Sequence, residues 1–148
     1  MKKLLSIIVA ISITCGSFAQ MGKVTSALSF IDQGLLDKAK EALDQALVNE
    51  KSKDNPKTWV AKGKLAQECF KSENPKFKAF YKDPLREAME AYEKALELDK
   101  KGSIEKQLKL SNTYVLLGND FITQGVQRFE AQDFAGALQS FESNIKLA

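Results

Sequence analysis

The chain has 148 residues, of which 44% are hydrophobic, and a formal net charge of +3. This length suggests one domain, and the apolar content is that of a globular protein. There is no histidine and there are only two cysteines. These counts exclude Ser-His and Cys-His catalysis and His-metal sites, and they also exclude a Cys-rich zinc site or a disulfide framework.

The first nineteen residues have the pattern of a secretory signal peptide. Lys2 and Lys3 precede an apolar run from Leu4 to Cys15, and small residues follow at Ser17 and Ala19. We therefore expect cleavage after residue 19 and an exported mature protein over residues 20–148 in the periplasm of a double-membrane bacterium. Outer-membrane association, secretion, an uncleaved anchor and a lipoprotein at Cys15 are the alternatives.

The predicted mature chain is close to neutral. Two of the 22 Lys and Arg residues lie in the signal peptide, which leaves a formal charge of +1. Nucleic-acid binding depends on neutralising phosphates, so we expect no nucleic-acid partner. Cys69 becomes the only thiol, and we interpret it as a small buried residue on a helix.

Apolar periodicity predicts helices throughout, over residues 21–33, 35–50, 56–71, 84–100, 104–131 and 133–147. Asn55-Pro56 and Asp83-Pro84 each place a capping residue before a proline at the first helical position. Gly102 is a candidate helix-terminating glycine. A helical stripe continues over the whole of 104–131, which favours one long helix, with Gly118 and Gly125 as the points where it could kink or break.

Three helical segments repeat with a period of 49 residues. Each has small and large residues at the spacing of one helix face. The aligned positions are Leu36, Ala39, Leu43, Ala46 and Leu47; then Leu85, Ala88, Tyr92, Ala95 and Leu96; and then Phe134, Ala137, Phe141, Asn144 and Ile145. Such a pattern lets a neighbouring helix approach at the alanine and pack against the large residue.

These residues resemble the tetratricopeptide repeat, a helix-turn-helix unit of about 34 residues. Trp59 and Gly63 match its first helix, and Ala88, Tyr92 and Ala95 match its second. Matches in the outer units are Ala27, Phe30, Ala39, Leu43, Ala46, Phe121, Gly125, Ala137 and Phe141. The resemblance implies a right-handed α-solenoid of about three units over residues 20–148. About 13 residues, 71–83, are inserted in the second unit, and the long helix lies before or within the third.

The resemblance also implies a function. Proteins of this family bind a partner protein or peptide in a concave groove, and we expect a non-enzymatic scaffold or adaptor. The groove positions carried over from the first helices are Val24, Leu28, Ile31, Val60, Lys64, Gln67, Ile122, Val126 and Phe129. Packing between units is the alternative role for these apolar side chains. Val24 and Leu28 replace the Lys and Asn of the family's carboxylate clamp, so we expect no clamp.

The insertion alternates lysines with Phe77, Phe80 and Tyr81. One interpretation is a basic-aromatic arm for a partner or membrane, which would make the protein an envelope-assembly or membrane-associated structural factor. The other is a short helix whose aromatic side chains cover the edge of the repeats.

We expect no enzyme, no cofactor, no metal and no small-molecule substrate. The carboxylates are scattered, and phosphate-binding loops and G-x-S-x-G are absent from the sequence. The chain closes on the apolar residues Leu138, Phe141, Ile145 and Leu147. Two hypotheses follow, namely that it is the N-terminal part of a longer array or that its C-terminal helix self-associates. The partner, the pathway and the oligomeric state are not fixed by the sequence.

Overall fold

The computed structural model describes residues 22–147, which are helical without any strand in that range. The prediction of an all-α protein is confirmed. After a first helix over 22–32, the elements are α2 (Leu36–Val48), α3 (Pro56–Lys71), α4 (Pro75–Lys78), α5 (Pro84–Leu98), α6 (Ser103–Leu110), α7 (Thr113–Glu130) and α8 (Phe134–Leu147). The predicted signal peptide, 1–19, lies outside the described residues. Within 22–147, none of the helices combines the length and apolarity that a membrane span requires.

All three prolines of the chain begin a helix. Each follows an Asn or Asp whose side chain accepts a hydrogen bond from a backbone N–H of the first turn. The distances are 2.9 Å from Lys57 N to Asn55, 3.0 Å from Lys76 N to Asn74 and 3.4 Å from Arg86 N to Asp83. The predicted caps at Asn55 and Asp83 are confirmed, and the third, at Asn74, starts the short α4 inside the insertion.

The prediction of one long helix over 104–131 is wrong. The chain leaves helical geometry at Asn112, whose φ of 51° is left-handed, so that α6 and α7 are separate. Asparagine tolerates this conformation better than most residues. Beside it, the Ser111 hydroxyl donates to the Gln107 carbonyl at 3.0 Å, a local bond that competes with helix continuation. Gly118 and Gly125, the expected break points, lie inside α7.

Two helix pairs share the same close contact between a glycine and an aromatic ring. A Cβ on Gly63 of α3 would lie 2.5 Å from the Tyr92 ring of α5, and a Cβ on Gly125 of α7 would lie 2.5 Å from the Phe141 ring of α8. Glycine is therefore needed at both positions for the helices to approach this closely. Tyr92 and Phe141 are equivalent in the 49-residue repeat.

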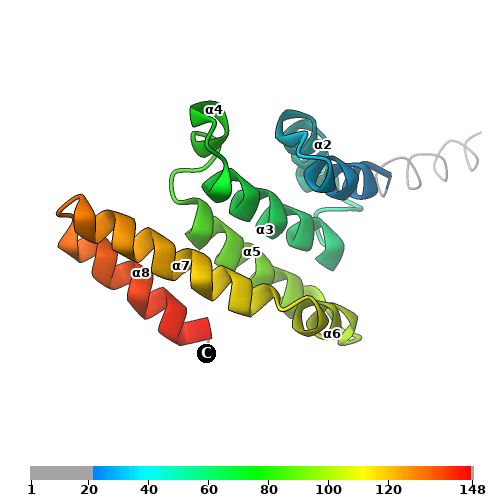
Figure 1. The fold of residues 1–148 in the computed structure, drawn as a ribbon. Coiled ribbons are helices and arrows are strands. Elements are labelled where there is room, and N and C mark those ends of the chain that lie inside the picture. Colours follow the sequence, from blue (N-terminus) through cyan, green and yellow to red (C-terminus); the bar gives the residue numbers. More distant parts are fainter. Residues whose placement is uncertain (1–21, 148) are drawn as a thin grey trace, which may run out of the picture.

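The helices pack in chain order into two cores. The first helix, α2 and one side of α3 form the first core, and the other side of α3, α5, α6 and α7 form the second. Figure 1 shows α2, α3, α5, α7 and α8 following one another across the molecule, with α8 at the edge. α3 is therefore shared between the two cores and holds the first helix pair on the rest.

Candidate binding groove

A hollow of about 370 Å³ lies where the first helix, α3 and α7 meet. Its walls come mainly from these three helices, with Tyr92 of α5 at its floor. The lining residues are Ile31, Asp32, Lys64, Gln67, Glu68, Lys71, Tyr92, Ser111, Thr113 and Leu116. The three helices are those that the sequence analysis assigned as first helices of successive units.

Gln67 forms hydrogen bonds to two other residues at the floor of this groove. Its side chain is nearly buried, and the Tyr92 hydroxyl donates to its Oε1 at 3.0 Å. Its Nε2 in turn donates to Asp120 Oδ2 on α7 at 2.6 Å. A buried amide with both ends satisfied fixes the neighbouring helices relative to one another. One residue of α3 thus connects α5 and α7.

The surroundings of Tyr92 favour the neutral form of its phenol, which is the form that donates a hydrogen bond. Burial, reinforced by the negative charges of Glu68 and Asp120, raises the pKa of its phenol above the ordinary value. Lys71 offsets part of this charge, because its ammonium lies 3.2 Å from Glu68 and 3.7 Å from Asp120. The floor is therefore a fixed polar network with its charges paired.

The rim of the groove has charges of both signs. Within the described part of the chain, the side chains of Lys64 and Asp32 make no ion pair or hydrogen bond with other residues. Ile31 and the half-exposed Leu116 add apolar surface on either side. Such a lining can hold a chain through its backbone polar groups, an acidic side chain and an apolar side chain.

Burial determines the protonation state of the one thiol among the described residues. Burial raises the pKa of the Cys69 thiol to about 11, so it stays protonated at neutral pH. Among the described residues, no group of three or more Cys, Asp and Glu side chains is placed to hold a metal ion. Cys69 packs in the first core and is not among the residues that line the groove.

The structure distributes the predicted groove residues over three environments. Ile31, Lys64 and Gln67 line the hollow. Val24 and Val60 are each 1% exposed and pack in the two cores, and Leu28 packs beside the first core. The third-unit residues Ile122, Val126 and Phe129 are 42–58% exposed and lie on α7 outside the hollow.

Sequence reasoning missed the residues that α7 contributes to the groove. Thr113 and Leu116 line it, and Asp120 accepts from Gln67. These three are spaced by three and four residues and share one face of α7. The break at Asn112 places the start of α7 at the groove. This break was not predicted from the sequence, because the apolar pattern continues over 104–131 without interruption.

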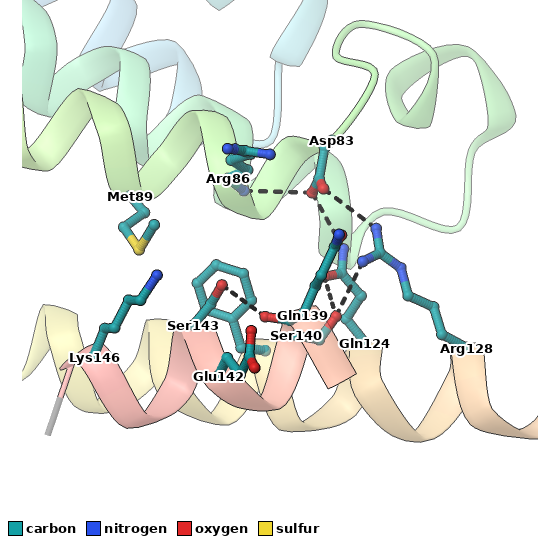
Figure 2. Close-up of a pocket in the computed structure, with 11 residues that line it drawn as sticks. Asp83, Arg86, Met89, Gln124, Arg128, Gln139, Ser140, Glu142, Ser143 and Lys146 are labelled. Atoms are coloured by element: carbon teal, nitrogen blue, oxygen red, sulfur yellow. Dashed lines mark hydrogen bonds and ion pairs between the residues drawn. The ribbon is translucent and has the colours of Figure 1, made fainter. Parts of the chain in front are cut away.

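A second hollow, between α5, α7 and α8, has a structural network at one end (Figure 2). Asp83, the N-cap of α5, pairs with Arg128 of α7 at 3.3 Å. Arg128 also donates to Ser140 of α8 at 3.1 Å, and Ser140 donates to Gln124 at 2.8 Å. Every hydrogen bond and ion pair named here joins two side chains of the protein. The network therefore fixes the α7–α8 pair on α5.

The insertion lies against α2. Phe77 and Phe80 meet edge to face, with ring centroids 5.5 Å apart, and pack with Tyr81 beside the first core. Lys76 pairs with Asp37 of α2 at 2.9 Å. Within the described structure, the aromatic side chains of the insertion cover the core, as the second interpretation expected.

Comparison with known proteins adds no relative. No protein-family model, no curated protein and no solved structure matches this chain. The likeness to tetratricopeptide repeats rests on the residues named above.

Proposed function

We propose that this protein is an exported adaptor of the tetratricopeptide type, which binds a segment of a partner protein in the groove between its first helices. The architecture in this proposal is a right-handed solenoid of three helix pairs, 22–48, 56–98 and 113–147. Stacked helix pairs of this kind produce an extended concave surface. The proposed location is the periplasm.

One observation carries the proposal. The hollow between the first helix, α3 and α7 has a rigid, internally satisfied floor and a rim whose charges are unpaired. A floor fixed by Gln67 limits the ordering that binding requires, which favours affinity. Lys64 is suited to an acidic side chain or a terminal carboxylate of the bound segment. The equivalent Gly63–Tyr92 and Gly125–Phe141 contacts support the assignment of 56–98 and 113–147 as repeated helix pairs.

Site-specific photo-crosslinking in the producing cell tests this function. A photoreactive amino acid at Leu116, in the groove, is compared with one at Val48, which is 80% exposed on α2 and is not among the residues that line the groove. We expect a discrete crosslinked partner from position 116, its loss in the Lys64→Glu background, and no such product from position 48. Equal crosslinking from both positions, or crosslinking indifferent to Lys64→Glu, would refute groove binding.

The membrane-associated alternative has less support than groove binding. It required Phe77, Phe80 and Tyr81 as a free arm, whereas these side chains pack beside the first core.

A further inference from the structure

Apolar side chains are concentrated on one face of the α7–α8 pair. Within residues 22–147, eleven large hydrophobic side chains are exposed, and eight of them lie on these two helices. We define the α7–α8 face by seven of these eight residues, which are Val115, Ile122, Val126, Phe129, Phe134, Leu138 and Ile145. The eighth, Leu116, lines the binding groove, and the remaining three are Leu35 before α2, Val48 on α2 and Leu110 on α6.

The rows have the spacing of a helix-packing seam. On α7, positions 115, 119, 122, 126 and 129 alternate steps of four and three residues, and on α8 positions 134, 138, 141 and 145 do the same. The rings of Phe129 and Phe134 meet edge to face with centroids 5.3 Å apart, which joins the two rows at the turn. None of these nine positions is charged. This is the pattern by which one helix layer receives another.

The molecule already shows what covers such a face. Counting from Gly63 and Gly125, Val60 corresponds to Ile122 and Gln67 corresponds to Phe129. Val60 packs in the second core with Leu117 of α7, and Gln67 bonds to Asp120 of α7. The positions that remain open on α7 are therefore those that, on α3, receive the next helix pair.

A second copy of this chain fits this face by its own α7–α8 face. The opposite end of the array presents α2, whose exposed side is charged and includes the Lys40–Asp44 and Lys76–Asp37 pairs. That surface cannot match an uncharged apolar seam. In the described structure, the one extended apolar surface complementary to the α7–α8 face is the same face on another molecule.

We propose that two copies associate through their α7–α8 faces in a two-fold symmetric dimer, with four helices at the interface. With full side-chain areas of about 160–210 Å², the seven exposed side chains present about 700 Å² of apolar surface per copy, close to the roughly 800 Å² per partner of a standard stable interface. It also exceeds the few hundred Å² that monomers usually leave exposed. Two-fold symmetry lets one patch serve both partners.

The dimer leaves the binding groove open. The groove uses Thr113 and Leu116 of α7, whereas the interface uses Val115, Ile122 and Val126. One dimer would therefore display two grooves, and a partner with two binding segments would engage both with increased avidity. The dimer itself does not depend on the proposed groove function.

Sedimentation equilibrium of the purified protein tests the dimer. The protein is purified from the producing cell and keeps the N-terminus that it has there. Val126→Glu and Leu138→Glu place a carboxylate in the seam on α7 and on α8, and Leu110→Glu is the matched control off the face. All three replace exposed residues, and circular dichroism checks that each variant keeps its helices.

We expect the parent chain and Leu110→Glu to dimerise at micromolar concentration with no larger species. Each face variant should raise the dissociation constant by about 100-fold or more, because a buried unpaired carboxylate strongly opposes association. A monomeric parent chain, a mass that keeps growing with concentration, or dimers that survive both face variants would each overturn the proposal.

Discussion

The contact between Gly63 and Tyr92 predicts that adding one methyl group will destabilise the protein. In Gly63→Ala the new Cβ would lie 2.5–2.8 Å from three atoms of the Tyr92 ring. The ring cannot easily move away, because it is 1% exposed and its hydroxyl is held by Gln67. Overpacking costs about 1–3 kcal/mol, and because this ring is held in place we expect the upper part of that range, about 2–3 kcal/mol.

Helix propensity acts in the opposite direction. Replacing a mid-helix glycine by alanine stabilises by about 1 kcal/mol, so the net loss in the free energy of unfolding should be about 1–2 kcal/mol. For a chain of this size that corresponds to a fall in Tm of roughly 4–8 °C. The assay is thermal and urea unfolding followed by circular dichroism at the helix band.

Gly125→Ala provides the matched comparison. Its Cβ would meet the Phe141 ring at the same 2.5 Å, but Phe141 is only half-buried and has no hydroxyl to hold it in place. This ring can shift, so we expect a clearly smaller loss than for Gly63→Ala. A Gly63→Ala protein as stable as the parent chain would refute the close packing of α3 on α5.

Two further predictions concern buried groups. Gln67→Leu should lower the free energy of unfolding by about 1–3 kcal/mol, because it leaves the Tyr92 hydroxyl without its acceptor and removes the hydrogen bond that Asp120 accepts. Adding Tyr92→Phe should restore part of that loss, and an additive double-mutant cycle from urea unfolding would contradict the network. Stability should also fall as pH rises from about 9 toward 11. Burial raises the pKa of the Cys69 thiol to about 11, and it raises the pKa of the Tyr92 phenol as well. The unfolded chain therefore releases these protons at a lower pH than the folded chain does, which favours unfolding. Urea midpoints at pH 8 and pH 10.5 measure this, with Cys69→Ala expected to reduce the difference and an unchanged midpoint counting against it.

Much of the fold was predictable because its signals are local. Asn55-Pro56 and Asp83-Pro84 fix helix starts through the cap and the proline ring, whatever the helices pack against. The 49-residue repeat identified Ala39 and Ala88 as close-approach positions, and both are fully buried. The break at Asn112 was missed because the apolar stripe continues across it, and a single left-handed residue leaves no mark on periodicity.

The groove was predictable only in part. Ile31, Lys64 and Gln67 line the hollow, and they were predicted because they match first-helix positions that the tetratricopeptide resemblance assigns to a groove. Asp120 and Leu116 were missed because their place depends on where α7 begins. The α7–α8 face illustrates the same limit. Ile122 and Phe129 occupy groove positions by sequence register, yet their surroundings depend on which helix pair follows.

Distances between repeat-equivalent residues test the central claim, that the helix pairs stack in an extended array. Glu41, Glu90 and Gln139 are exposed, are spaced by 49 residues, and lie on α2, α5 and α8. Spin labels are placed on these positions in pairs, with Cys69 replaced by alanine, and the distances are measured by pulsed electron paramagnetic resonance. The account predicts that the 41–139 distance is longer than both 41–90 and 90–139. A 41–139 distance as short as either neighbouring one would indicate a closed bundle and contradict the stacked array.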